Sequence, residues 1–274
     1  MDYDRVLETV LAWANRTETV RCVVLTGSAA SATAHPLSDR DLELHVRNTE
    51  PLEQDDSWWS TLGDVLAVER LENGDDQPTR LVYYVGGKLD FTLVDIRGER
   101  GIYDRPFKVL LDKDGEAAGF RVDAPPHPSV DQEAFDDCLN WGYAAALMIA
   151  KAIVREEPWT VKIRDSDLKN ELLRVIEWDH SARHGDKVDV RHLGAGMRGW
   201  MDVDVQQRLD ACWASFDLSD SQRALLASLD LFRDLATRTA TIAGLKDFDH
   251  DAVQTEVMTI LRTAEIPEPR PSAV

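Results

Sequence analysis

Cysteine is scarce in this chain of 274 residues. Cys22, Cys138 and Cys212 are odd in number and widely spaced, so they predict neither a disulfide framework nor a C-x-x-C zinc motif. The chain has no run of about 18 apolar residues, and no membrane-spanning helix is expected. Residues 1–10 contain acidic residues near their start and do not have the basic segment followed by an apolar segment that is typical of a signal peptide. From these absences we expect a location in the reducing cytoplasm and no association with a membrane.

Basic residues are in short supply as well. The chain has 31 Lys and Arg against 50 Asp and Glu, which gives a formal net charge of −19. Such a surface repels the phosphates of nucleic acids and anionic lipids, so we expect no nucleic acid as a partner. It attracts polycations, although an acidic surface can also serve solubility alone.

The first part of the chain alternates helix and strand patterns. Apolar spacing predicts a helix over 3–15 and a short one over 58–62. Apolar runs and alternating segments predict strands over 20–26, 40–47, 65–71, 80–86, 88–95 and 107–112. Gly86 and Gly87 form the two-residue signal of a hairpin. This order predicts a mixed β-sheet with flanking helices.

The second part of the chain has mainly helical patterns. A Pro-rich segment over 123–129 predicts a linker, and a Pro-rich tail follows from Pro267. Between them, helical patterns cover 130–155, 159–184, 203–216, 219–245 and 247–264. The predicted class is therefore α+β, with an N-terminal domain over 1–122 and an all-α helical bundle over 130–266. The oligomeric state stays open, a monomer included.

The stretch 23–46 carries the pattern most indicative of chemistry. A short apolar strand ends at Gly27 and Ser28, and about ten residues later Asp39 and Asp41 open the next strand. Glycine lets a backbone approach a phosphate closely, and a serine at a helix start lies beside N–H groups that favour anions. Taken singly, these pieces are an ordinary turn and a solvated strand end.

Strand alternation brings a third acidic residue into the pattern. Along 40–46 and 88–94, alternate apolar residues predict a core face, and Asp39, Asp41 and Asp90 fall on the opposite face. If the two strands are close in one sheet, the three carboxylates converge. Like charges resist ionising together, and Mg²⁺, which prefers oxygen ligands, would relieve this repulsion. Two such ions are typical of in-line phosphoryl displacement.

This joint pattern resembles the DNA polymerase beta-like nucleotidyltransferase superfamily, whose signature is a Gly-Ser turn followed by a two-acid strand motif. The resemblance implies that Gly27 and Ser28 form the nucleotide-binding turn. It also implies that Asp39, Asp41 and Asp90 are the metal ligands and catalytic carboxylates.

The chain departs from that superfamily at two places. Arg40 stands where an apolar residue is usual, and the loop 29–37 is rich in Ala and lacks the common Arg-Gly.

Longer blocks are similar to the bacterial aminoglycoside 6-adenylyltransferases, in the same order over most of 20–240. The blocks include VVLTGS, SDRDLELHV, GGKLDFTLVD, FKVLLDKDG, FDDCLNWGYAAALMIAKAIVREE, LKNELLRVIEWDHSARHG and SLDLFRDLATRTA. The resemblance implies that AMP passes from ATP to a hydroxyl of the streptidine ring of streptomycin, foremost the 6-hydroxyl, and that pyrophosphate is released. The basic segment 194–198 corresponds to a phosphate-binding segment of the family, with Arg198 as its basic group and Ala195 where a Lys is frequent.

The implied chemistry uses ATP as co-substrate, Mg²⁺, and a cationic aminoglycoside as acceptor. Asp90 is the foremost candidate to take the proton of the acceptor hydroxyl, while Mg²⁺ on Asp39 and Asp41 neutralises the developing charge. Two alternatives stay open. One is the same transfer to another small hydroxylated acceptor or to a protein side chain, and the other is a non-catalytic protein that binds cationic antibiotics.

Two histidines near the end of a predicted helix attract notice as metal ligands. His180 and His184 follow closely on Asp179, but this spacing does not make a convincing zinc motif. No zinc site is therefore predicted.

Overall fold

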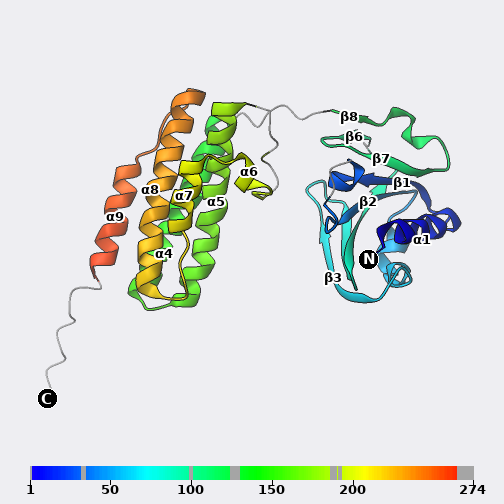
Figure 1. The fold of residues 1–274 in the computed structure, drawn as a ribbon, viewed down its shortest axis with the longest axis horizontal. Helices are drawn as coiled ribbons and strands as arrows, with labels where there is room; N and C mark the ends of the chain where they lie inside the picture. Colours follow the sequence, from blue (N-terminus) through cyan, green and yellow to red (C-terminus); the bar gives the residue numbers. More distant parts are fainter. Residues whose placement is uncertain are drawn as a thin grey trace, which may run out of the picture. The chain divides into compact units, whose positions relative to one another are not determined.

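A computed structural model describes residues 2–31, 35–98, 101–123, 130–185, 190 and 193–263. The chain divides into two compact units, Met1–Pro125 and Pro126–Val274 (Figure 1). The first is built on a mixed sheet, and in the second the described residues form helices and no strand, so the predicted α+β class is confirmed. Residues 124–129 of the predicted linker over 123–129, and the tail from Pro267, lie outside the described residues.

Within the described part of the first unit, six strands form one sheet in the order β3-β4-β5-β2-β1-β7. They are β1 (Val20–Thr26), β2 (Arg40–Val46), β3 (Val65–Glu72), β4 (Pro78–Tyr84), β5 (Gly87–Asp95) and β7 (Lys108–Asp112). The pair β2 and β5 is parallel, and the other neighbours are antiparallel. All six predicted strands are thus confirmed, with small shifts at their ends.

The hairpin between β4 and β5 differs by one residue from its prediction. Tyr84 pairs with Gly87, so the two loop residues are Val85 and Gly86. The positive φ of 88° falls at Gly86, whereas Gly87 already belongs to β5. The loop therefore needs glycine at position 86, where φ is positive, and not at position 87, which pairs with Tyr84 in the sheet.

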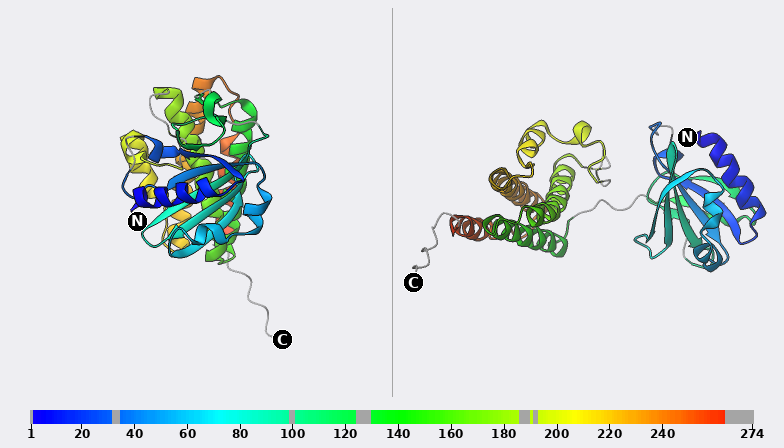
Figure 2. Two further views of the ribbon diagram at one scale, coloured as in Figure 1. Left: turned by 90° about the vertical axis from the view of Figure 1, so that its right-hand side faces the viewer. Right: turned by 90° about the horizontal axis from the view of Figure 1, so that it is seen from below.

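One face of the sheet is covered by helix α1 (Tyr3–Arg16), together with α2 (Glu50–Gln54), which the sequence did not predict, and α3 (Ser57–Ser60) (Figure 2). Asp2 caps α1 by accepting a hydrogen bond from the backbone N–H of Arg5 at 3.2 Å. Trp58 of α3 stacks on Trp13 of α1 at 4.8 Å and meets Phe91 of β5 edge-on at 5.0 Å. The alternate apolar residues of β2 and β5 lie in this core, as predicted.

The opposite face of the sheet, which carries the predicted acidic residues, is covered for part of its length. The short strands β6 (Ile102–Tyr103) and β8 (Arg121–Val122) lie over it with the 3-10 helix η2 (Glu116–Gly119). Tyr103, Phe107 and Phe120 pack against Cys22 and Val24. This small core buries the C-terminal end of β2, where His45 is 1% exposed.

The second unit contains the long helices α4 (Gln132–Val154), α5 (Pro158–His184) and α8 (Leu218–Ala243), with α9 (His250–Arg262) beside α4 (Figure 1). Gly142 of α4 lets Phe232 of α8 pack closely, because a Cβ at Gly142 would lie 2.7 Å from its Cζ. The helix predicted over 203–216 ends early, since α7 spans Val203–Ala211. None of the described helices is long and apolar enough to cross a membrane.

Candidate active site

The parallel register of β2 and β5 places Asp41 directly beside Asp90. Both side chains point away from the Leu42 and Phe91 core face, because side chains alternate along each strand. Asp39 precedes β2 on the same side. The structure therefore brings together the three carboxylates that the alternation pattern selected.

Lys88 bridges two of these carboxylates and balances their charge. Its Nζ lies 3.1 Å from Asp39 Oδ2 and 2.9 Å from Asp90 Oδ2, and its side chain is 17% exposed. Burial disfavours the charge, but the hydrogen bonds with Asp90 and Asp39 outweigh it and raise the pKa of Lys88 above its ordinary value. No role was predicted for Lys88, although its spacing of two residues from Asp90 puts both side chains on one face of β5.

The carboxylates of Asp41 and Asp90 are difficult to ionise in this setting. Burial raises the pKa of Asp90 to about 6, against the effect of Lys88 and with further help from the charges of Asp41 and Asp39. Burial, followed by the charge of Asp39, also raises the pKa of Asp41. A divalent cation at this place would favour the ionised forms of both groups.

The donor set fits a magnesium ion. Asp90 Oδ1 is buried and has no hydrogen-bond partner, which is unusual for a buried oxygen. Hard carboxylate oxygens are the ligands that Mg²⁺ prefers. The three carboxylates do not form a closed cage here, since within the described ranges their oxygens are not all within 4.8 Å of one another. The ammonium of Lys88 fills the space between Asp39 and Asp90.

The Gly-Ser turn lies against this cluster. Gly27 and Ser28 begin η1 (Gly27–Ala30), a 3-10 helix directly after β1, and Ser28 is exposed. Gly27 has a φ of +70°, and a Cβ there would lie 2.3 Å from Asp41 Oδ2. The backbone at this position can therefore approach the carboxylate only because the residue is glycine. Of the predicted loop 29–37, residues 32–34 lie outside the described part.

Arg40, one of the departures from the superfamily pattern, faces the other side of the strand. Its guanidinium carbon lies 4.0 Å from the centre of the Tyr3 ring, a cation–π contact. Its Nη1 donates to the carbonyls of Ser38 at 2.6 Å and Asp39 at 3.2 Å. The arginine thus fixes the backbone that presents Asp39, a positioning role that an apolar residue could not fill.

A cavity of about 400 Å³ opens beside Asp39 and Lys88. The rings of Tyr3 and Tyr83 and the exposed Leu66 form part of its lining. Aromatic walls with two charged groups at one side suit a ligand that has both a flat or apolar part and a charged part.

A second polar group on this face was missed by the sequence reasoning. Tyr103 donates a hydrogen bond of 2.8 Å to Glu43 Oε2, and His45 Nε2 lies 3.1 Å from the same oxygen. Glu43 follows Asp41 by two residues and shares its face, so this network supports β2 behind the carboxylates. Tyr103 comes from a two-residue strand, which leaves no periodic signal in the sequence.

Arg198, the remaining predicted site residue, belongs to the second unit. It is exposed on the short helix α6 (Met197–Trp200) and borders a cavity of about 220 Å³ with Met197 and Val203. It is not among the residues that the first unit brings together.

Known proteins share both parts of this chain. The family described as streptomycin adenylyltransferase matches residues 2–259. The aminoglycoside 6-adenylyltransferase of Campylobacter jejuni is 24% identical over 255 residues, or 86% of this chain and 87% of the relative. The enzyme of the same name from Bacillus subtilis strain 168 is 22% identical over 266 residues, or 90% and 93%.

A crystal structure of an aminoglycoside 6-adenyltransferase from Bacillus subtilis is similar with a TM-score of 0.47 and 19% identity, over 93% of this chain and 97% of that one. The resemblance inferred from the sequence blocks is confirmed by the family match. Because this match includes the strands of the candidate site and the helices of the second unit, the chain belongs to the streptomycin adenylyltransferase family of enzymes.

Proposed function

We propose that this enzyme transfers AMP from ATP to a hydroxyl group of an aminoglycoside, with streptomycin and its 6-hydroxyl as the first candidate. The observation that carries the proposal is the pairing of Asp41 with Asp90, whose buried Oδ1 lacks a partner. In a chain of this family, such an oxygen is the expected ligand of a metal that accompanies a nucleotide. Relatives named aminoglycoside 6-adenylyltransferase support the class of acceptor.

In the proposed reaction, Asp90 accepts the proton of the acceptor hydroxyl. The oxygen then forms a bond to the α-phosphorus, the bond from that phosphorus to the bridging oxygen breaks, and pyrophosphate leaves. A carboxylate with a pKa of about 6 is ionised at neutral pH and is a better base than an ordinary aspartate. Magnesium held by Asp39, Asp41 and Asp90 would supply charge neutralisation at the phosphoryl oxygens.

Lys88 has a defined place in this proposal. Its ammonium occupies the position between Asp39 and Asp90 that a metal would need. We propose that Lys88 is the counter-ion of these carboxylates before nucleotide binds and that it turns to the phosphates afterwards. Gly27 and Ser28 then present backbone and hydroxyl groups to the triphosphate.

The acidic composition suits the proposed acceptor. A net charge of −19 attracts a polycation such as an aminoglycoside and speeds its encounter with the enzyme. We also propose a cytoplasmic location, where ATP is available. Cys22, Cys138 and Cys212 are buried and none is in a disulfide, which suits a reducing compartment.

The decisive experiment is product analysis after incubation with ATP, Mg²⁺ and streptomycin. A mass increase of one adenylyl group (AMP less one water) on the antibiotic, with release of pyrophosphate, is expected, and fragmentation identifies the modified hydroxyl. Asp41→Asn and Asp90→Asn should abolish the product. Asp95→Asn, at the far end of β5, is the matched control and should retain activity.

Other outcomes separate the alternatives. Modification of a different aminoglycoside would keep the chemistry and change the acceptor. Tight binding of aminoglycosides by calorimetry, without nucleotide binding or pyrophosphate release, would instead favour a binding protein over an enzyme of this specificity.

A further inference from the structure

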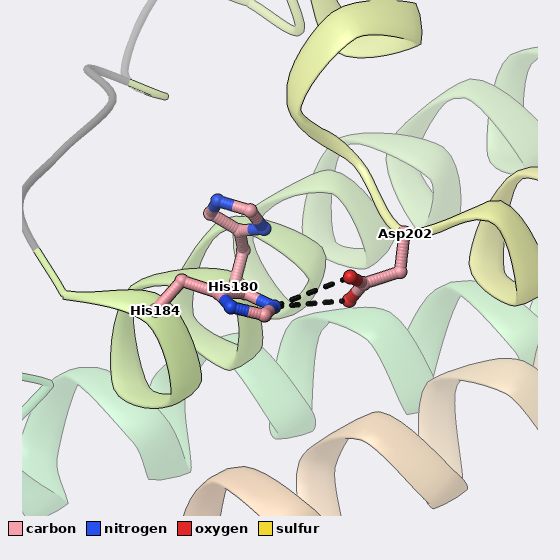
Figure 3. A group of neighbouring side chains, drawn as sticks. All are labelled: His180, His184 and Asp202. Atoms are coloured by element: carbon pink, nitrogen blue, oxygen red, sulfur yellow. Dashed lines mark hydrogen bonds and ion pairs between the residues drawn. The ribbon is translucent and has the colours of Figure 1, made fainter.

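A compact group of metal-ligand side chains lies in the helical unit, apart from the carboxylates of the sheet. His180 and His184 are one turn apart near the end of α5, and Asp202 immediately precedes α7 (Figure 3). One ligand atom from each of the three residues lies within 4.8 Å of the other two. Across the described residues, no other group of three or more His, Cys, Asp or Glu side chains meets this criterion.

The distances within the group suit a small divalent ion. His184 Nε2 lies 3.2 Å from Asp202 Oδ1, and the two imidazole centres are 4.6 Å apart. Bonds of about 2.0–2.1 Å in a tetrahedral zinc site place neighbouring ligand atoms roughly 3.3 Å apart. Two of the three ligands therefore already have the required separation.

His180 supplies an independent sign of a ligand. Its side chain is only 7% exposed, and its Nδ1 is buried without a hydrogen-bond partner. The ring lies 5.1 Å from Trp200, centre to centre, and is held against this aromatic wall. Buried nitrogens normally have a partner, and a metal ion would provide one.

The carboxylate of Asp202 is oriented by its surroundings. Asp202 is the N-cap residue of α7, yet its side chain makes no capping bond. Its Oδ2 instead accepts a hydrogen bond from Arg183, which also donates to Asp179 Oδ2 at 2.7 Å. Arg238 in turn donates to Asp179 at 2.5 and 2.6 Å. This outer network fixes the carboxylate, whose Oδ1 and Oδ2 lie 3.2 and 3.4 Å from His184 Nε2, as second-shell groups orient ligands around metals.

We propose that His180, His184 and Asp202 bind a zinc ion, with a water molecule as the fourth ligand. Two imidazoles and one carboxylate are a borderline-soft set, which suits zinc and excludes Mg²⁺ as a preferred occupant. The ion would join the end of α5 to the start of α7 and so fix the chain that carries α6. The spacing of His180 and His184 beside Asp179 predicted no zinc here, and the third ligand of the proposed site, Asp202, lies 18 residues beyond His184.

The test uses the full-length chain without an affinity tag, first stripped of metal and then titrated with zinc against a competing chelator. We expect one equivalent to bind to the wild type. His184→Asn and Asp202→Asn each remove a direct ligand and should weaken binding by more than the roughly 10- to 100-fold typical of the loss of an outer-shell partner. His184 is 44% exposed, so its replacement leaves the buried core untouched, and circular dichroism checks the fold of both variants.

Matched controls locate the bound ion. His35→Asn removes an exposed histidine outside the group and should bind zinc like the wild type. Asp41→Asn should also retain the zinc equivalent, which separates this site from the carboxylates of the sheet. Zinc should raise the melting temperature of the wild type and leave that of His184→Asn unchanged.

Cobalt substitution provides a spectroscopic readout. Co²⁺ should give the intense visible bands of a four-coordinate site in the wild type, and these bands should be absent in His184→Asn. The proposal is overturned if the wild type retains no zinc, or if His184→Asn and Asp202→Asn bind it as tightly as the wild type. Failure of this test leaves the proposed adenylyl transfer intact, because neither residue belongs to that site.

Discussion

The ammonium of Lys88 lies 2.9 Å from Asp90 Oδ2 and bonds Asp39 on its other side. A single cation thus balances the charge of two carboxylates, and the pKa of the neighbouring Asp41 is raised. The net charge of the candidate site therefore depends on one side chain of β5.

Replacement of Lys88 by Met should therefore impair the enzyme strongly. The carboxylates would lose their counter-ion, and the proposed phosphate contact would be absent. We expect kcat/KM for ATP to fall by about 10²-fold or more, as for other lost electrostatic contacts in active sites. Steady-state kinetics at saturating streptomycin measure this. Lys108→Met on β7, an exposed lysine, is the control, and equal activity of both variants would remove Lys88 from the site.

The activity should depend on pH through Asp90. A general base acts only when deprotonated, so at low Mg²⁺ kcat/KM should fall as the pH drops through the pKa of Asp90, about 6 without a metal. Because a bound cation favours the ionised carboxylate, higher Mg²⁺ should move this fall to lower pH. Above that pH the profile should be level until another group titrates. The measurement is kcat/KM between pH 5 and pH 8 at constant ionic strength, with a coupled assay for pyrophosphate. A level profile down to the lower end at low Mg²⁺ would show that Asp90 is not the base.

Gly27→Ala tests the close approach of the turn to Asp41. The new Cβ would lie 2.3 Å from Asp41 Oδ2 at a residue with positive φ, so the carboxylate must move. We expect near-complete loss of activity and a loss of stability of about 1–3 kcal/mol. Gly115→Ala is the matched control, because its φ is also positive, +76°, but no atom lies within 4 Å of the new Cβ. Gly115→Ala should lose some stability and retain full activity.

Gly142→Ala tests the packing of the helical unit. A methyl group there would lie 2.7 Å from Phe232 Cζ, so α4 and α8 must separate or the ring must turn. Overpacking of this kind costs about 1–3 kcal/mol in the free energy of unfolding, measured by denaturant titration. Gly199→Ala in α6 meets no atom within 4 Å and should be neutral or slightly stabilising. A neutral Gly142→Ala would contradict the close contact.

Asp56 should contribute an acid-sensitive part of stability. Burial opposes its charge, but hydrogen bonds from Arg70 and Arg80 prevail, and the pKa of Asp56 is lowered from its usual value. A carboxyl with a lowered folded-state pKa stabilises the fold fully above its unfolded value, about 3.9, and this contribution is lost as the pH falls through the folded value.

Asp56→Asn should therefore unfold more easily than the wild type at pH 7, by about 1–3 kcal/mol, because Arg80 is 8% exposed and would lose its ionic partner. The difference between the two proteins should shrink below about pH 4. Urea titrations at pH 7 and pH 3.5 measure it. A difference that stays constant over this range would contradict the assignment to the Asp56 charge.

Much of the sheet could be predicted because apolar and polar residues alternate along its strands. Strand side chains alternate with a period of two, and the buried face of β2 and β5 is uniformly apolar, so the position of Asp41 and Asp90 on the other face followed. The spacing could not show that Lys88 would stand between the carboxylates, since that depends on the distance between side chains of different segments.

The remaining features had no local signal. Strands β6 and β8 have two residues each, too few for a periodic pattern, so the burial of His45 beneath Tyr103 was not foreseen. Asp202 meets His184 only because α5 and the start of α7 are brought together by the helical core. Ligand sets assembled from distant segments need the fold, and the sequence spacing of two members was insufficient.

The parallel alignment of β2 with β5 also makes the site sensitive to slippage. A shift of one residue would place Leu89 or Phe91 beside Asp41 and turn Asp90 toward the apolar core. Leu89 and Phe91 are fully buried, so the displaced pairing would expose them and lose their hydrophobic packing. The apolar packing on one face of the sheet thus fixes the register that positions the acidic residues on the other face. Core substitutions that weaken this packing should therefore lower the catalytic activity before they unfold the protein.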